Sequence, residues 1–506
     1  MMQQSLQDGF GGVRNHGRWP HSSGRGSDRR HADTPNPLQR RPRRRSLTRS
    51  APLWMVAVLS LALPGAGRPA VAGHGIVLDQ EVDAAGKGYT ILLLWGTDYQ
   101  MGYAQAELLG EYLVQGAQEV ESFLGALYPS VRSIMGQAVW MPPGLEDEFQ
   151  GMVDALALSH PEAAIDVLDL KVASTVGEWF YGCRSHTCWG RYVEAPLRTL
   201  STRRLDFPAV LQSMKHHVVC VHDPSDGSPR WVNLSWPGIV TAATGVNEFG
   251  TLVSLHDYAC STDFAVGRMP RMVACRYALS LATGADVSAH LDAVFAELQT
   301  YELMTGSFFN YYAPEGHGGV MVGHPYKTGT PDFHYLRRPQ GSWHHGEAMI
   351  TTNAWTDGTY TPADEDFGAD AYYGDESPKT LESHWNLLAA GSNPLHLLSV
   401  AYRARGDMTV WADGRLDGAN RTPRLEWEWD ALFAAAGPAS GDFDLDGDVD
   451  LADHARFAAC LTGPAQGAAF ETPWQKCLDA FDADEDADVD LADAAALQHL
   501  FTGELR

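Results

Sequence analysis

A thiol, an arginine and a carboxylate stand near one another in one stretch of this chain. Cys183 follows Gly182 directly, and Arg203 and Asp206 come after an intervening turn-forming segment. If a hairpin brings these groups together, the thiol can act as the nucleophile of an acyl-transfer reaction. If the chain is cut before Cys183, the new α-amino group, whose usual pKa is about 8, can serve as its base. The stretch therefore predicts covalent catalysis by a terminal residue.

Simpler interpretations of these residues stay open. Cys183 could be a small buried apolar residue, which is the usual environment of a free cysteine. Cys188 is a rival nucleophile, although its position beside a tryptophan favours a buried strand residue. Arg203 and Asp206 could form an ordinary ion pair at a strand end, with Arg204 as the neighbour that faces solvent.

Four segments, taken in order, resemble the N-terminal-nucleophile (Ntn) hydrolases of the penicillin acyltransferase and acid ceramidase type. Together they cover roughly residues 88–360. The first covers residues 90–113 and consists of a strand, a Gly-Thr-Asp-Tyr-Gln-Met-Gly-Tyr turn and a helix. The second is Gly182-Cys183, followed by Trp189-Gly190 and Arg203-x-x-Asp206-Phe207. The third runs from Trp236-Pro-Gly to Asn247-Glu-Phe-Gly250, and the fourth is Thr351-Thr-Asn353.

The resemblance implies a fold and a set of roles. The fold would be α+β, a four-layer αββα sandwich, and the Gly182–Cys183 bond would be cut by Cys183 itself. Arg203 and Asp206 would orient the new terminus, and the Asn353 amide would donate to the oxyanion. Catalysis would need no cofactor, and the substrate would be a small acylated amide or a peptide.

Two further polar residues are candidates for substrate binding. His256 stands where relatives often have Asn. Asn247 precedes Glu-Phe-Gly between two apolar runs, which is typical of a hairpin turn rather than of catalysis. The acidic stretch from Asp357 to Asp375 contains no arginine, whereas bile-salt-hydrolase-like relatives carry one after the late asparagine.

The first 72 residues indicate export. Residues 1–50 carry eleven Arg against three Asp, and an apolar run, Leu53–Leu63, follows. That run is too short to span a bilayer, and Ala70-Val71-Ala72 is a small-x-small cleavage pattern. We therefore expect a signal peptide and a secreted, periplasmic or cell-envelope location; Arg44-Arg45 also resembles a twin-arginine signal. The remaining net charge is acidic, which argues against nucleic-acid binding.

The C-terminal segment contains two acidic repeats after a linker at 437–441. Both repeats place Asp at loop positions 1, 3, 5, 9 and 12, a spacing that can wrap oxygen ligands around Ca²⁺. With the helices expected after each loop, they resemble a dockerin-type repeat, which implies a cohesin-like or cell-surface protein partner. Cys460 and Cys477 flank the segment between the repeats and are the favoured disulfide pair. The expected ligands are Asp442, Asp444, Asp446, Asp450, Asp453, Asp482, Asp484, Asp486, Asp490 and Asp493.

The middle of the chain shows helical and strand-like patterns that fit an α+β class. The strands follow one another through short turns, one of them at Asp226-Gly227, which favours antiparallel pairing. The expected helices cover Ala104–Phe123, Leu145–Ala157, Asp166–Val176, Pro270–Ala282 and Ser288–Leu298. The expected strands cover Val218–His222, Trp231–Leu234, Ile239–Ala243 and Thr251–His256.

The sequence therefore predicts five parts: a leader (1–72), two parts of one catalytic domain (73–182 and 183–436), a linker, and a small helical Ca²⁺-binding domain (442–506). The favoured function is cleavage of carbon–nitrogen amide bonds. Transfer of the acyl group to an amine would use the same residues. The alternative from another class is a non-catalytic surface or scaffold protein that keeps the fold and docks through its tail.

Overall fold

The computed structural model describes the chain from His74 onward, with gaps. The described residues are 74–178, 182–193, 199–206, 211, 213–257, 266–281, 287–313, 317–327, 330–337, 343–351, 355–356, 369–389, 396–403, 407–412, 425–428, 432–433, 441, 449, 451–461, 477, 480–481, 489 and 491–500. The leader, the signal-like run and its cleavage pattern lie outside them.

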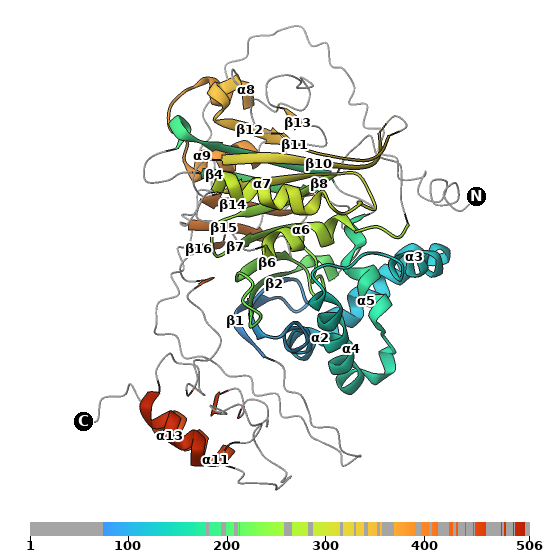
Figure 1. Ribbon diagram of the computed structural model, residues 1–506, viewed down its shortest axis with the longest axis vertical. Coiled ribbons are helices and arrows are strands. Elements are labelled where there is room, and N and C mark those ends of the chain that lie inside the picture. Colours follow the sequence, from blue (N-terminus) through green and yellow to red (C-terminus); the bar gives the residue numbers. More distant parts are fainter. Residues whose placement is uncertain are drawn as a thin grey trace. The chain divides into compact units, whose positions relative to one another are not determined.

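Two β-sheets form the body of the protein (Figure 1). All neighbouring strands pair antiparallel except β2 and β5, which are parallel. The nine-stranded sheet has the order β1 (Gly75–Val82), β2 (Gly88–Gly96), β5 (His216–Pro224), β6 (Trp231–Ser235), β7 (Thr244–Asn247), β8 (Leu252–Asp257), β9 (Ser307–Ala313), β10 (His317–Lys327) and β11 (Thr330–Arg337). The seven-stranded sheet has the order β13 (Trp355–Thr356), β12 (Ala348–Thr351), β3 (Gly182–Trp189), β4 (Thr199–Asp206), β14 (His396–Arg403), β15 (Asp407–Ala412) and β16 (Leu425–Glu428).

Helices pack against both sheets, which confirms a mixed α+β class. In the nine-stranded sheet, α2 (Asp98–Leu124) contacts β1 and β2, α6 (Arg271–Ser280) contacts β7 and β8, and α7 (Val287–Leu298) contacts β9 to β11. Figure 1 shows α6 and α7 lying across this sheet. In the seven-stranded sheet, α9 (Leu381–Ala389) contacts β3, β4 and β14, while β3 meets β8 of the other sheet. The remaining helices of the body are α3 (Tyr128–Met135), α4 (Gly144–Ser159), α5 (Val167–Ser174) and α8 (Ala369–Gly374).

The segment from 88 to 124 shows how local chemistry sets this arrangement. β2 ends at Gly96, and Thr97 caps α2: its hydroxyl accepts from the Gln100 N–H, and the Gln100 side chain accepts from the Thr97 N–H at 2.8 Å. A Cβ on Gly102 would lie 2.0 Å from the backbone oxygen of Glu148, so α2 can cross α4 closely only at a glycine. The expected strand, turn and first helix are confirmed here.

Most of the elements expected in the middle of the chain are also confirmed. The five helices are present with boundaries shifted by up to six residues, and Gly227 has φ +84° in the expected turn. The strand expected over Ile239–Ala243 is wrong. Its buried backbone is satisfied by side chains instead: Ser174 Oγ accepts from the Val240 and Thr241 amides, and Asn233 Nδ2 donates to the Ile239 and Thr241 carbonyls. The next strand, β7, begins only at Thr244.

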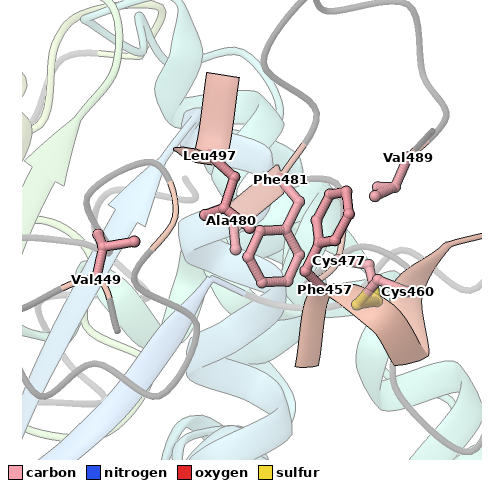
Figure 2. Packing of buried hydrophobic residues seen from close by; sticks show 8 residues of the cluster. All are labelled: Val449, Phe457, Cys460, Cys477, Ala480, Phe481, Val489 and Leu497. Carbon is pink, nitrogen blue, oxygen red and sulfur yellow. A yellow bond between two sulfur atoms is a disulfide. The ribbon is translucent and has the colours of Figure 1, made fainter. Parts of the chain in front are cut away.

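The tail has a small core of its own. The expected Cys460–Cys477 disulfide is present, and it joins a cluster that also contains Phe457 and Phe481, whose rings meet edge to face (Figure 2). Two helices, α11 (Leu451–Cys460) and α13 (Leu491–Leu500), supply part of this cluster. Its other members are Val449, Ala480, Val489 and Leu497. Gly441, which the sequence placed in the linker, donates its N–H to the Ala480 carbonyl at 2.6 Å.

Across the described residues, no helix combines the length and the apolar character needed to span a bilayer.

Candidate active site

The two candidate nucleophiles lie on the same strand but face opposite ways. Cys183 and Cys188 are both in β3, five residues apart. Successive side chains of a strand alternate between its faces, so an odd separation puts the two thiols on opposite sides of the sheet. The contacts agree. Cys183 contacts Arg203, whose guanidinium also bonds to β8 of the nine-stranded sheet, whereas Cys188 contacts His384 of α9.

Cys183 and Arg203 meet inside the predicted hairpin. β3 and β4 pair antiparallel with Cys183 opposite Leu205 and Ser185 opposite Arg203. The Arg203 Nη2 donates to the Cys183 Sγ at 3.3 Å and to the Leu255 carbonyl of β8 at 2.9 Å. Cys183 is 6% exposed and Arg203 is 1% exposed, so water screens the attraction between the thiol and the guanidinium only poorly. A buried cation at this distance stabilises a thiolate, which is the nucleophilic form.

Arg203 retains hydrogen-bonding capacity within the site. Among the described residues, its Nε and Nη1 atoms have no hydrogen-bond partner. An arginine has five N–H donors in a fixed planar fork, and leaving such donors buried without an acceptor is costly. An acceptor beside the thiol would satisfy these donors. Asp206 is the acceptor that the sequence suggests; its backbone pairs with Gly182, and its side chain lies outside the described part.

His256 joins the two sheets next to Cys183. Its Nε2 lies 2.8 Å from the Ser185 hydroxyl of β3 and 3.3 Å from the Ser254 hydroxyl of its own strand, β8. Burial, and next the positive charge of Arg203, hold the pKa of His256 well below its usual range, so the ring is neutral at physiological pH. A backbone hydrogen bond with Cys183 acts in the opposite direction. The histidine expected to bind substrate is fully buried in this uncut chain.

The chain that leads into Cys183 is anchored by a buried carboxylate. Glu178 accepts from the Met272 N–H at the start of α6 (3.0 Å) and from the Thr305 hydroxyl (2.7 Å). Burial raises the pKa of Glu178, and Arg271, whose Nε is 3.9 Å away, opposes that shift. Arg271 also donates to the Gly177 carbonyl at 2.6 Å. Position 178 is therefore held from several sides, four residues before Gly182.

Cys188 has different neighbours. Its Sγ lies 3.5 Å from the His384 Nε2, which also contacts the Tyr373 hydroxyl at 3.0 Å. Burial raises the pKa of the Cys188 thiol, with only partial relief from Lys379. Burial also lowers the pKa of His384 to about 3, and Lys379 adds to this effect. A neutral thiol beside a neutral imidazole, both fully enclosed, is a packed core pair.

Several expected site residues lie elsewhere or outside the described part. Asn247 acts as the turn residue that the sequence suggested: its Oδ1 accepts from the Thr251 N–H at 3.0 Å, and its Nδ2 donates to the Leu279 carbonyl. Asn353 is outside the described residues, and β12 ends two positions earlier at Thr351, which pairs with Ser185. Arg204 was expected to face solvent. That expectation is wrong, because β4 lies inside its sheet and Arg204 is only 5% exposed.

In the tail, only the last ligand of each expected calcium loop is described. Asp453 and Asp493 lie in the first turns of α11 and α13, at equivalent positions of the two repeats. They are 0% and 1% exposed, which is unusual for carboxylates. The other expected ligands, Asp442, Asp444, Asp446, Asp450, Asp482, Asp484, Asp486 and Asp490, lie outside the described residues.

Sequence reasoning missed three parts of the site: Ser185, Ser254 and the Leu255 carbonyl. A signal for Ser185 did exist, because a residue two positions after Cys183 on a strand shares its face. No local signal marks the partners on β8, since they belong to the other sheet and lie about 70 residues further along the chain.

Comparisons with known proteins add little to this geometry. No family model and no curated protein matches the chain. Among solved structures, the N-acylethanolamine-hydrolyzing acid amidase (NAAA) ortholog of Caenorhabditis elegans is similar at 14% identity, over 49% of this chain and 99% of that one, with a TM-score of 0.29. A likeness of this size decides neither the fold nor the activity.

Proposed function

We propose that this chain is an exported, self-cleaving Ntn hydrolase that cleaves carbon–nitrogen amide bonds through an acyl-enzyme on Cys183. The observation that supports it best is the buried contact of 3.3 Å between the Arg203 guanidinium and the Cys183 thiol, on a strand in which Gly182 comes immediately before the cysteine. Two facing sheets with helices packed against each fit the four-layer αββα sandwich that this function requires.

The first reaction would be the cut before Cys183. The Sγ attacks the Gly182 carbonyl carbon, the carbon–nitrogen bond breaks, and the thiol proton passes to the Cys183 nitrogen. The resulting thioester is then hydrolysed by water, which leaves a carboxylate on Gly182 and returns the thiol. Gly182 has no side chain to obstruct the approach to its carbonyl. The products would have about 110 and about 324 residues after loss of the leader.

Turnover would use the same thiol with a free terminal amine as base. The amine takes the thiol proton, Sγ attacks the substrate carbonyl, and the leaving amine receives the proton. Arg203 and Asp206 would position the new terminus. The register of β12 supports Asn353 as the oxyanion donor. Thr351, two positions before Asn353, pairs with Ser185, which stands two positions after Cys183 on the antiparallel strand. Such a donor is typically worth about 3 kcal/mol in the transition state.

The two pieces would remain one folded unit after the cut. β2, from the first piece, pairs with β5, from the second, over nine residues of parallel ladder. The fully buried Glu148 of α4 also forms an ion pair with Arg276 of α6 at 2.5 Å. Burial alone would raise the pKa of Glu148, but Arg276 and His222 outweigh that effect and lower it. Separation would expose this pair, so the cut should be visible only under denaturing conditions.

A direct experiment tests the acyl-enzyme. The protein is mixed with a panel of acyl p-nitroanilides, quenched in acid during turnover, and digested for peptide mass analysis. We expect an acyl adduct on the peptide that begins with Cys183, and none on the peptide that contains Cys188 when the two are separated by digestion after Arg184. Turnover without any adduct on Cys183, under conditions where a thioester survives, would contradict the proposal. Adding amines would distinguish transfer from hydrolysis.

The competing proposal is a non-catalytic surface protein with the same fold. The buried Cys183–Arg203 contact disfavours it, because a structural thiol has no need of a buried cation. It would gain support if no acyl amide were turned over and the chain stayed intact.

For the tail, we propose Ca²⁺ binding and docking to a cohesin-like or cell-surface protein. The buried carboxylates of Asp453 and Asp493 support it, since charges in an interior need compensation. Titration of residues 441–506 with Ca²⁺, followed by circular dichroism, should show a gain of helix that is lost in Asp453→Asn/Asp493→Asn. The loop that starts at Asp442 should bind more tightly, because it has Gly447 where the second has Ala487. No change at millimolar Ca²⁺ would overturn this proposal.

A further inference from the structure

His256 is placed to act on the strand that carries Cys183 rather than on a substrate. The residue is completely buried between the sheets, on β8, in the uncut chain. Its Nε2 contacts the Ser185 hydroxyl at 2.8 Å and the Ser254 hydroxyl at 3.3 Å, and the two hydroxyls lie 3.4 Å apart. Two hydroxyls, one from each sheet, thus converge on one nitrogen.

The neutral state of this ring suits a bridging role. A neutral imidazole has one donor and one acceptor nitrogen, so it can link two groups in a fixed direction. One side of the His256 ring is committed to the hydroxyls of Ser185 on β3 and Ser254 on β8. Ser185, two residues after Cys183, shares its face of β3. The imidazole therefore holds β3 at Ser185, the next residue after the nucleophile on the same face.

We propose that His256 is a positioning residue for the cut before Cys183: through Ser185 it fixes the strand so that Sγ reaches the Gly182 carbonyl. This inference rests on the proposed self-cleavage. Glu178 supplies the fixed point on the other side, through its bonds to the Met272 amide and the Thr305 hydroxyl. The bond to be broken lies between these two anchors.

The cut should depend on His256 more than turnover does. Before the cut, Cys183 is constrained from both directions, because Glu178 and Ser185 are parts of one continuous chain. Afterwards the link to Glu178 is gone, and Arg203 still contacts the thiol from the neighbouring strand. Loss of the imidazole should therefore slow maturation more than it slows catalysis by chains already cut.

The test follows cleavage of the full chain over time, by denaturing mass spectrometry, and measures amide hydrolysis per cut chain. His256→Ala should slow cleavage at least tenfold and reduce turnover per cut chain by a smaller factor. His256→Gln, whose amide can reach the place of Nε2, should restore cleavage to within about threefold of wild type. His217→Gln is the matched control, since His217 is also buried in the same sheet and burial also lowers its pKa, to about 3.

Ser185→Ala gives a second route if His256→Ala fails to fold. It should slow cleavage in the same direction, and Ser185→Ala/His256→Ala should be slowed clearly less than the product of the two single slowing factors, because both act through one contact. Cleavage of His256→Ala at the wild-type rate would overturn the proposal. Equal slowing in His256→Ala and His217→Gln would also overturn it, by showing a general loss of stability. Failure of the proposed function looks different, since the wild-type chain itself would then stay uncut.

Discussion

The two ends of β3 hold chemically identical thiols in opposite environments. At the end that begins with Gly182, the Cys183 Sγ lies 3.3 Å from a buried guanidinium. Toward the other end, the Cys188 Sγ lies 3.5 Å from a neutral imidazole, and burial raises its pKa. The first environment places a buried cation beside the sulfur, and the second keeps the sulfur as a neutral thiol.

The difference follows from strand parity and from what covers each face. An odd separation sends the two side chains to opposite sides of the sheet. On the face of Cys183, the neighbouring strand β4 contributes Arg203 and the nine-stranded sheet contributes His256, whereas the face of Cys188 meets α9. A Cys–His pair at hydrogen-bond distance would suggest a catalytic dyad. In this chain, the thiol that has a histidine partner is Cys188, and Cys188 is a buried core residue.

Removing each thiol should produce the largest contrast. Cys183→Ala should abolish both the chain cut and amide hydrolysis, because no other group can form the acyl-enzyme. Cys188→Ala should leave most of both. Intact mass and a chromogenic amide assay on the two variants measure this. An inactive Cys188→Ala that is fully folded would reverse the assignment.

Removing the partner of each thiol should give the next largest effect. Arg203→Met takes the buried cation from Cys183, and we expect turnover to fall about 100-fold or more, as for loss of a positioned charge in an active site. His384→Gln takes the imidazole from Cys188 and should change turnover by less than about threefold. Steady-state rates per cut chain decide between these outcomes; equal losses in the two variants would show that both ends serve catalysis.

The sequence predicted one end of β3 better than the other. Gly182-Cys183 and Arg203 lie in one hairpin, so local spacing sufficed to place them together. The partners of Cys188 come from α9, nearly 200 residues later, and no pattern in the sequence links them. The same limit applies to β2, whose parallel partner β5 follows only after four α-helices and two strands. The strand expected over Ile239–Ala243 failed because its hydrogen bonds go to Ser174 and Asn233.

Acid should lower the free energy of unfolding through His384, the partner of Cys188. The pKa of His384 is about 3 in the folded chain, below its usual value of about 6.5. The unfolded chain therefore binds the proton more tightly, and the stability gained from the neutral ring is complete above about pH 6.5 and is lost as pH falls toward 3. Between pH 6.5 and 5 the loss is about 2 kcal/mol from this group. Denaturant unfolding of His384→Gln should show a flatter pH dependence than wild type; equal slopes would contradict the assignment.

The smallest expected effect is on stability at neutral pH. Cys188→Ala removes one buried sulfur atom from a packed cluster with Tyr192, Leu200 and Tyr373, and it should lower the free energy of unfolding by about 1 to 2 kcal/mol. Chemical denaturation of Cys183→Ala and of Cys183→Ala/Cys188→Ala, which are both uncut, measures the difference.

The most direct test of the account is the intact mass of the purified chain under denaturing conditions, with wild type and Cys183→Ala prepared side by side. We predict two polypeptides from the wild type, the larger one beginning at Cys183, and a single uncut polypeptide from Cys183→Ala. A single uncut polypeptide from a wild-type preparation that hydrolyses an acyl amide would contradict the central claim, because Cys183 would then have no free amine to act as its base.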